Sequence, residues 1–183
     1  MIDHSKVFKY CPRCGEGLKP QEHDRQMMPT CINKQCGFIF WQTSSPTVAA
    51  IILNSNEQVL YTRRAIDPDK GKLDLPGGFL QYGELPEVGM KREALEEIGV
   101  EIEIMNIIGF VMDRYYYQDI MMRNLVIGME AKILGDDPVI GDSSEIAEIV
   151  WCDVNSIKAS DLAVTYNEKL LMLFKLRNTK QQT

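Results

Sequence analysis

Apolar runs in the middle and late parts of the chain predict a series of strands. Residues 47–53 and 58–62 are rich in β-branched and aliphatic side chains, and the turn residues 54–56 between them predict a hairpin. Comparable runs predict three further strands, at residues 101–112, 124–133 and 146–152. Two closing segments, residues 155–160 and 167–176, have helical patterns, the second with an apolar face.

The stretch from Gly77 to Val100 predicts a turn followed by a helix. Its glycine pair follows Pro76 and indicates a turn. Pro86 suits the first position of a helix, and Gly99 stands where a helix ends. Aliphatic residues at the spacing of a core-facing stripe are Val88, Leu95 and Ile98. With strands on both sides of this helix, the chain is predicted to adopt a layered α+β fold.

Three glutamates share one face of the predicted helix. Glu93, Glu96 and Glu97 stand at positions i, i+3 and i+4. Their like charges would weaken an isolated helix, whereas Mg²⁺ or Mn²⁺ prefers carboxylate oxygens and would reverse that repulsion. A solvated acidic face is the plain alternative, so the spacing alone leaves both readings open.

The letters around the three glutamates complete a longer motif. They follow Gly-x5-Glu-x7-Arg-Glu-U-x-Glu-Glu-x-Gly-U without a gap, where U is aliphatic. At roughly 7% usage per letter, seven fixed identities coincide by chance about once in 10⁸ registers. The matching residues are Gly78, Glu84, Arg92, Glu93, Ala94, Glu96, Glu97, Gly99 and Val100. This motif is the Nudix box, and the chain therefore resembles a Nudix hydrolase.

The resemblance implies a mixed-sheet α/β/α sandwich that hydrolyses a nucleoside diphosphate linked to another moiety. Water attacks an anionic diphosphate slowly unless metal ions neutralise its charge and orient the nucleophile. The resemblance makes Glu93 and Glu97 the principal ligands of Mg²⁺ or Mn²⁺. It adds Glu96, directly or through water, and the backbone carbonyl of Gly78.

The resemblance also suggests the remaining roles around the metal. Glu84 and Arg92 are expected to pair with each other and to hold the loop against the helix. In many Nudix enzymes a glutamate before a late strand activates water, and Glu145 is the first choice for this general base. Glu148 is the second choice, and Glu93 itself is a third.

Candidate substrate contacts are less specific. Arg64 ends a predicted strand and Arg114 precedes three consecutive tyrosines, so either guanidinium can contact phosphate. The middle tyrosine, Tyr116, is a candidate for stacking on a base or sugar. The alternative is that residues 115–117 alternate in a strand, with Tyr116 facing solvent. The Ser-Gln-Pro-Trp-rich stretch of NADH pyrophosphatases and the later proline of many ADP-ribose pyrophosphatases are both missing, so the substrate is not fixed.

Two cysteine pairs lie near the N-terminus. Cys11, Cys14, Cys31 and Cys36 form a Cys-x2-Cys-x16-Cys-x4-Cys pattern, which suits a structural Zn²⁺ held by four thiolates. Two disulfides are an alternative that an intracellular chain disfavours, and a redox dithiol would need only one pair. We therefore predict a zinc ribbon at residues 1–43 and a Nudix domain at residues 44–183. The ribbon resembles that of NADH-pyrophosphatase-type Nudix proteins, in which it supports the fold and often a dimer.

Charge and hydropathy exclude some classes of function. Residues 1–43 contain six basic and four acidic residues, which leaves 14 basic and 22 acidic residues in the remainder, so the charges are +2 and −8. This acidic body argues against nucleic acid as a partner. Residues 1–10 lack the apolar run of a signal peptide and no segment reaches membrane-span length, so a cytoplasmic location without membrane contact is expected.

Two functions from different classes fit these observations. The first is a Mg²⁺-dependent Nudix pyrophosphohydrolase acting on ADP-ribose, NAD(H), FAD or a similar nucleotide. The second is a nucleotide-sensing module that binds without turnover and contacts a partner through the ribbon. The complete set of glutamates favours the enzyme, because a pure binder does not need all three. A homodimer is a further expectation.

Overall fold

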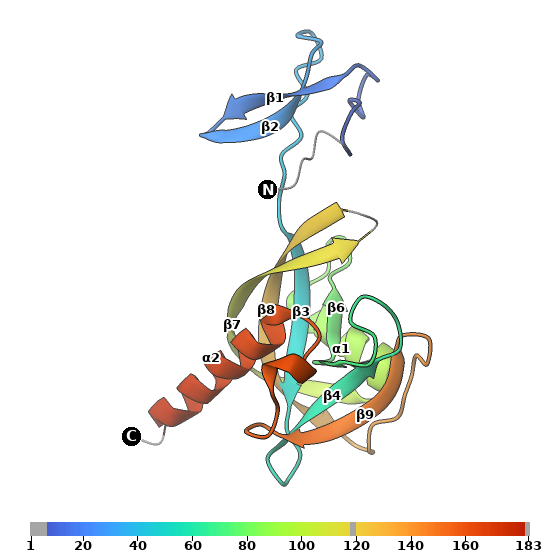
Figure 1. Cartoon of the computed structure of the whole chain (residues 1–183), viewed down its shortest axis with the longest axis vertical. Coiled ribbons are helices and arrows are strands. Elements are labelled where there is room, and N and C mark those ends of the chain that lie inside the picture. Colours follow the sequence, from blue (N-terminus) through green and yellow to red (C-terminus); the bar gives the residue numbers. More distant parts are fainter. Residues whose placement is uncertain (1–6, 118–119, 182–183) are drawn as a thin grey trace. The chain divides into compact units, whose positions relative to one another are not determined.

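The computed structural model describes residues 7–117 and 120–181, and the chain divides into two compact units (Figure 1). The first unit comprises Met1–Ser44 and Tyr116–Met122, and the second comprises Ser45–Tyr115 and Arg123–Thr183. The first unit thus takes in a later segment that the predicted boundary between residues 43 and 44 assigned to the second domain.

Residues 7–44 of the first unit are built on one antiparallel hairpin. Strand β1 (Leu18–His23) pairs with β2 (Gln26–Cys31) along its full length. The turn residues Asp24 and Arg25 have positive φ angles of 48° and 64°, as in a type I′ turn, whose twist matches that of the strands. A two-stranded hairpin is marginal by itself in water, so this unit needs further stabilisation.

The second unit contains two sheets and two α-helices. The four-stranded sheet has the order β6-β3-β8-β7 and is mixed, because β3 is antiparallel to β6 and parallel to β8. The other sheet has the order β5-β4-β9 and is antiparallel. The helices are α1 (Pro86–Ile98) and α2 (Thr165–Gln181). The strands are β3 (Ser45–Ile52), β4 (Gln58–Arg64), β5 (Leu73–Asp74), β6 (Gly77–Phe79), β7 (Glu101–Tyr117), β8 (Ile120–Leu134) and β9 (Ile146–Asp153).

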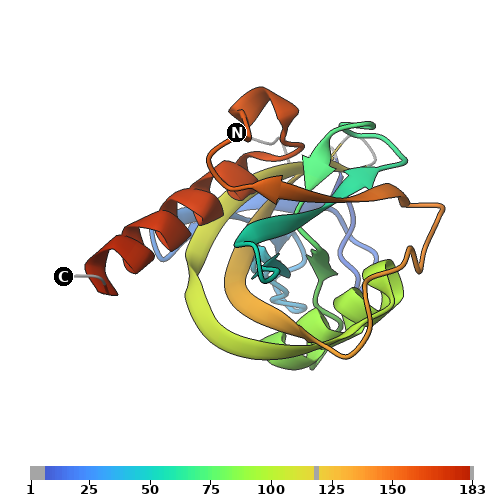
Figure 2. The same ribbon diagram turned by 90° about the horizontal axis from the view of Figure 1, so that it is seen from below.

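Strand β3 separates two hydrophobic cores. Its alternate side chains point to opposite faces, so that Val48, Ala50 and Ile52 pack in the core with α1. Ala49 and Ile51 pack in the core with α2. Figures 1 and 2 show the two helices on opposite sides of the sheets. The predicted α+β class with a mixed sheet between helices is therefore confirmed.

Helix α1 has the predicted ends but a different buried face. Pro86 occupies its first turn, and Gly99 terminates it with a φ of 66°. The predicted core-facing stripe is wrong at two of its three positions, because Val88 and Leu95 are more than half exposed while only Ile98 is buried. The residues that α1 buries are Gly89, Met90, Ala94 and Ile98. The helix is therefore rotated so that Glu93 and Glu97, next to Ala94 and Ile98, face the protein and not the solvent.

Three other predictions differ from the structure. The predicted hairpin is present only at its closing turn, where Leu53 and Val59 form an isolated antiparallel bridge, because β3 and β4 belong to different sheets. The predicted helix at residues 155–160 is replaced by a turn and by the short 3₁₀ helix η2 (Ala159–Asp161). Strand β7 continues five residues beyond its predicted end. These differences arise because sheet pairing and burial override local propensity.

Candidate functional site

The glycines between β6 and α1 allow the main chain to approach the carboxylates of the helix. The Gly77 N–H donates a 3.0 Å hydrogen bond to Glu97 Oε2. A Cβ on Gly77 would lie 2.1 Å from the carbonyl oxygen of Val48, and Gly77 has a φ of 151°. A Cβ on Gly78 would lie 2.6 Å from Glu93 Oε1. Position 77 therefore requires glycine, a side chain at position 78 would displace the Glu93 carboxylate, and the loop lies directly against Glu93 and Glu97.

Arg92 joins this loop to the helix through five acceptor oxygens from four residues. Its guanidinium donates two 2.9 Å hydrogen bonds to the two oxygens of Glu84, in a bidentate pair. It also donates to Glu93 Oε1 at 2.7 Å, to Glu96 Oε2 at 2.9 Å and to the Phe79 carbonyl at 3.1 Å. The predicted pair of Glu84 and Arg92 is therefore present, and it bridges the loop and α1.

The glutamates of this site differ in pKa, because Arg92 dominates at Glu84 whereas burial dominates at Glu93 and Glu97. The hydrogen bond from Arg92, together with the Gln81 N–H, lowers the pKa of Glu84 to about 2. Burial raises the pKa of Glu93 above its ordinary value, although Arg92 opposes the shift. Burial also raises the pKa of Glu97 well above its ordinary value, and the nearby charge of Glu93 adds to this. Two adjacent carboxylates that resist ionisation are an arrangement that a cation would stabilise.

The donor set of this site fits a hard divalent cation. Glu93 and Glu97 lie one turn apart on α1, and both are partly buried beside the glycine loop. Glu96 differs, since its side chain is more than half exposed and its carboxylate binds Arg92. Carboxylate and backbone carbonyl oxygens are the ligands that Mg²⁺ and Mn²⁺ prefer. The arrangement therefore suits Glu93 and Glu97 as direct ligands and Glu96 as a more peripheral one.

The two candidate bases outside the box have different surroundings. Glu145 is exposed immediately before β9, and its carbonyl accepts a 2.7 Å hydrogen bond from the Ala65 N–H. Its charge contributes to the raised pKa of both Glu93 and Glu97, so its carboxylate lies within electrostatic range of them. Glu148 instead forms a 2.7 Å ion pair with Arg63. This difference favours Glu145, the first choice from the sequence.

Arg64 is engaged inside the protein. Its guanidinium donates to Asp74 Oδ2 at 3.1 Å and to the Pro68 carbonyl at 2.8 Å. Asp74 is almost fully buried, and burial raises its pKa despite hydrogen bonds from Tyr166 and other donors. At least two of the donors of Arg64 are thus committed to this cluster, and its predicted contact with phosphate stays a prediction.

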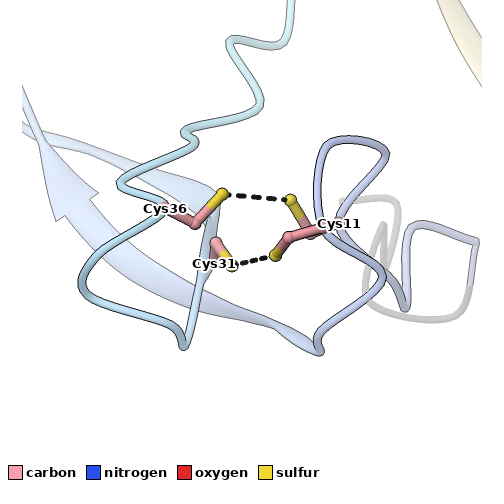
Figure 3. Close-up of side chains that lie close together, drawn as sticks. Cys11, Cys31 and Cys36 are labelled. Atoms are coloured by element: carbon pink, nitrogen blue, oxygen red, sulfur yellow. Dashed lines mark hydrogen bonds between the residues drawn. The ribbon is translucent and has the colours of Figure 1, made fainter.

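The four cysteines of the first unit come together. Their Sγ atoms all lie within 4.8 Å of one another. The closest described sulfur pairs are Cys14 with Cys31 at 3.5 Å and Cys11 with Cys36 at 3.8 Å, which are not disulfide distances (Figure 3). Four thiol ligands at this spacing could hold a tetrahedral metal ion.

Backbone hydrogen bonds prepare one of these thiols for metal binding. Burial raises the pKa of Cys11, but hydrogen bonds from the Arg13 and Cys14 backbone and from the Cys14 and Cys36 side chains outweigh it and bring the pKa to about 7. The thiolate is the form that binds a metal. Burial raises the pKa of Cys31 instead. The cluster would therefore release protons as it takes up a metal ion.

A family profile described as the NUDIX domain matches residues 43–174 of the chain. The chain belongs to the Nudix family. Its matched region contains the box loop, helix α1 and Glu145. Residues 1–42 of the first unit lie outside the matched residues, whereas its later segment, Tyr116–Met122, lies within them.

Individual relatives agree with this membership. The chain is 25% identical over 149 residues to the NAD-capped RNA hydrolase NudC of Pseudomonas aeruginosa, which covers 81% of this chain and 49% of the relative. The chain thus spans about half the length of that protein. A solved Nudix hydrolase from Nitrosomonas europaea is 28% identical, with a TM-score of 0.68 over 86% of this chain and 85% of that one.

A further solved Nudix domain shares the fold of this chain at lower sequence identity. The Nudix domain of Shewanella oneidensis NrtR, solved with ADP ribose, is 21% identical, with a TM-score of 0.58 over 75% of this chain and 90% of that one. Within the described residues of our Nudix chain, no helix is long and apolar enough to cross a membrane.

Tyr115 was not identified from the sequence as an aromatic neighbour of the Nudix box. Phe79, which follows the glycine pair, packs edge-to-face on Tyr115, with ring centroids 5.8 Å apart. The predicted contacts Arg114 and Tyr116 are exposed on β7, as the strand alternative required for Tyr116. Alternation along β7 distinguishes Tyr115 from Tyr116, so a correct end for this strand would have identified Tyr115.

Proposed function

We propose that the chain is a divalent-cation-dependent hydrolase that cleaves the diphosphate linkage of a nucleoside diphosphate derivative. One observation carries the proposal: the glycine loop lies directly against two partly buried carboxylates, Glu93 and Glu97, which both resist ionisation. An anionic pair of this kind beside main-chain carbonyls is costly without a cation. Its presence within a complete Nudix box supports turnover over mere binding.

Each residue of the site has a distinct part in the proposed reaction. Glu93, Glu97 and the Gly78 carbonyl would hold Mg²⁺ or Mn²⁺, with Glu96 beside them. The cation, when bound, would neutralise the diphosphate and stabilise the leaving oxygen. Arg92 fixes Glu93 and keeps the loop on the helix. Water adds to one phosphorus, the bridging P–O bond breaks, and Glu145 takes the proton from the attacking water.

The relatives narrow the class of substrate. NudC is described as acting on NAD-capped RNA, and the NrtR domain binds ADP ribose, so both handle a nucleoside diphosphate joined to a second group. In this chain the exposed ring of Phe79 follows the metal-site glycines and packs on Tyr115. An aromatic edge beside a diphosphate site suits a base or sugar of the substrate. ADP-ribose, NAD(H) and FAD are therefore the substrates we expect.

The cysteine cluster would hold one structural Zn²⁺. All four ligands come from the protein, so this site is closed and would not take part in catalysis. A cytoplasmic location and a homodimer stay predictions.

A hydrolysis panel tests the proposed activity. ADP-ribose, NADH, FAD, NAD-capped RNA and nucleoside triphosphates would be incubated with Mg²⁺ or Mn²⁺, and the released mononucleotide measured. We expect turnover of the diphosphate-linked compounds, and we expect Glu97→Gln to abolish it while the fold is kept. Glu103→Gln is the matched control, because Glu103 is an exposed carboxylate paired with Lys132. Undiminished turnover in Glu97→Gln would contradict the assignment of the metal site.

A nucleotide sensor is the second candidate, favoured by the fold shared with the ADP-ribose-bound NrtR domain. It predicts saturable binding of ADP-ribose without release of AMP under any metal condition. Binding measured by calorimetry alongside the hydrolysis panel separates the two candidates, since the enzyme consumes the ligand and the sensor does not.

A further inference from the structure

A buried polar cluster joins the C-terminal helix to the strand that leads into the metal site. Asn167, near the start of α2, is fully buried, and Asp74 on β5 is only 7% exposed. The Asn167 amide donates to Asp74 Oδ1 at 2.9 Å, and Tyr166 donates to the same oxygen at 2.7 Å. Arg64 donates to Oδ2 at 3.1 Å. Asp74 thus accepts hydrogen bonds from three side chains of two separate elements.

Hydrogen bonds fix alternate backbone positions in the segment that leads into the glycine loop. The Leu73 carbonyl accepts a 2.8 Å hydrogen bond from the Ala163 N–H. The Leu75 N–H donates to Asn167 Oδ1 at 3.1 Å. Two residues later, the Gly77 N–H donates to Glu97 Oε2 at 3.0 Å. The segment is therefore held by the start of α2 at one end and by the carboxylate of Glu97 at the other.

We propose that Asn167 and Asp74 are positioning residues of the metal site, which set the backbone of residues 75–77 so that the Gly77 N–H stays on Glu97. This inference rests on the proposed function, because it gives Glu97 its role as a metal ligand. Neither side chain is one of the proposed metal ligands. Both act through Leu75 and the short segment that follows it.

The burial of these groups supports a positioning role. A buried amide or carboxylate costs stability unless each polar atom has a partner, and apolar side chains of similar size would fill this space at lower cost. A fully satisfied network of this kind fixes one backbone arrangement more narrowly than apolar packing does. Ligands of a metal site must be held within about 0.5 Å of their productive geometry, and the residues behind them supply that precision.

A pair of variants on the same helix separates positioning from stability. Asn167→Ala removes the hydrogen bonds to Leu75 and Asp74. Leu171→Ala, the matched control, removes buried packing from α2 but leaves the cluster intact. The affinity of the full chain for Mn²⁺ would be measured by electron paramagnetic resonance, and the protection of the Gly77 amide by hydrogen exchange. Both are readouts that do not depend on turnover.

We expect Asn167→Ala to weaken Mn²⁺ binding about tenfold or more and to speed exchange of the Gly77 amide. Leu171→Ala should keep Mn²⁺ affinity within about twofold, although it loses comparable stability. Should Asn167→Ala fail to fold, Tyr166→Phe removes one donor to Asp74 and should weaken Mn²⁺ binding about threefold. Affinity or Gly77 protection equal to that of Leu171→Ala would overturn the inference. Wild-type protein that binds no Mn²⁺, or Glu97→Gln that binds it as tightly, would overturn the proposed function itself.

Discussion

The two candidate metal sites of this chain are assembled in opposite ways. The four thiols come from two short segments, residues 11–14 and 31–36, in the N-terminal segment of the first unit, where the described strands are the single hairpin of β1 and β2. The carboxylate site lies on a helix that packs on a large core, and its parts come from residues 77–97 and from Glu145. The thiol set is closed and local, whereas the carboxylate set is open and depends on distant segments.

This difference separates a metal that folds the protein from a metal that serves its chemistry. An N-terminal segment of about forty residues cannot bury enough apolar surface to be stable alone, so metal binding would supply folding free energy there. The second unit has two hydrophobic cores on either side of β3 and should keep its fold without a cation. Loss of each metal should therefore have a different consequence.

The largest expected effect is loss of the thiol site. Cys31→Ser should remove binding free energy on the order of 10 kcal/mol and unfold residues 7–41, because the hairpin alone is marginal. Zinc content after dialysis and the dispersion of the amide spectrum would show this. Cys152→Ser is the control, since Cys152 lies on β9 outside the cluster, and it should retain one zinc per chain. An ordered first unit without bound metal would contradict the claim that the thiol site is needed for folding.

Loss of the general base should be the next largest effect. Glu145→Gln should lower kcat about 10²- to 10⁴-fold, because a positioned base contributes that much, while Mn²⁺ affinity changes little. The pH–rate profile should also lose its ascending limb. Glu148→Gln is the matched variant, and with its carboxylate already paired to Arg63 it should lose less than about threefold. A larger loss in Glu148→Gln than in Glu145→Gln would reverse the assignment.

Local spacing in the sequence predicted the cysteine cluster and the ends of α1, but it did not predict which face of α1 is buried. The cysteine pairs, and Pro86 and Gly99 at the ends of α1, are fixed by short-range stereochemistry, and the structure has them as predicted. The buried face of α1 was mispredicted because the amphipathic rule assumes that acids point to water. A candidate metal site instead requires acidic side chains that face the protein, and here Glu97 faces the protein while Leu95 is exposed.

Contacts between distant segments were not predictable from the pattern. Asp74 and Asn167 are 93 positions apart, and an asparagine at the start of a helix is typical of a local cap. Nothing in the alternation of β5 or α2 indicates that these two side chains meet. The box could be identified from its letters, whereas the residues that hold it required the tertiary structure.

Arg92→Lys tests how much the hydrogen bonds of Arg92 contribute to the carboxylate site. A lysine cannot form the bidentate pair with Glu84 or reach acceptors on four residues at once, so kcat/KM should fall about 10- to 100-fold. Steady-state kinetics with a metal titration would measure it. Arg63→Lys, which changes a half-exposed pair with Glu148, should stay within about twofold. Equal losses in both variants would mean that Arg92 does no more than fill a surface position.

The smallest expected effect concerns stability without a cation. Because the folded protein raises the pKa of Glu97, it binds a proton there more tightly than the unfolded chain does. The metal-free protein should therefore lose stability as pH rises from the ordinary pKa of a glutamate through the raised value. Glu97→Gln removes this charge, so at neutral pH its unfolding free energy should be about 1 kcal/mol higher than that of the wild type, or about 2–4 °C in Tm.

The same variant should show no such advantage at acidic pH, where Glu97 is protonated in both states. Excess Mg²⁺ should stabilise the wild type and leave Glu97→Gln almost unchanged, which reverses their order at neutral pH. Calorimetry of the wild type and of Glu97→Gln, after dialysis into magnesium-free buffer, would be run at neutral and acidic pH with and without added Mg²⁺. A Glu97→Gln protein that is less stable than the wild type without metal would mean that the Gly77–Glu97 contact serves the fold. The carboxylate site would then resemble the thiol site more than the structure suggests.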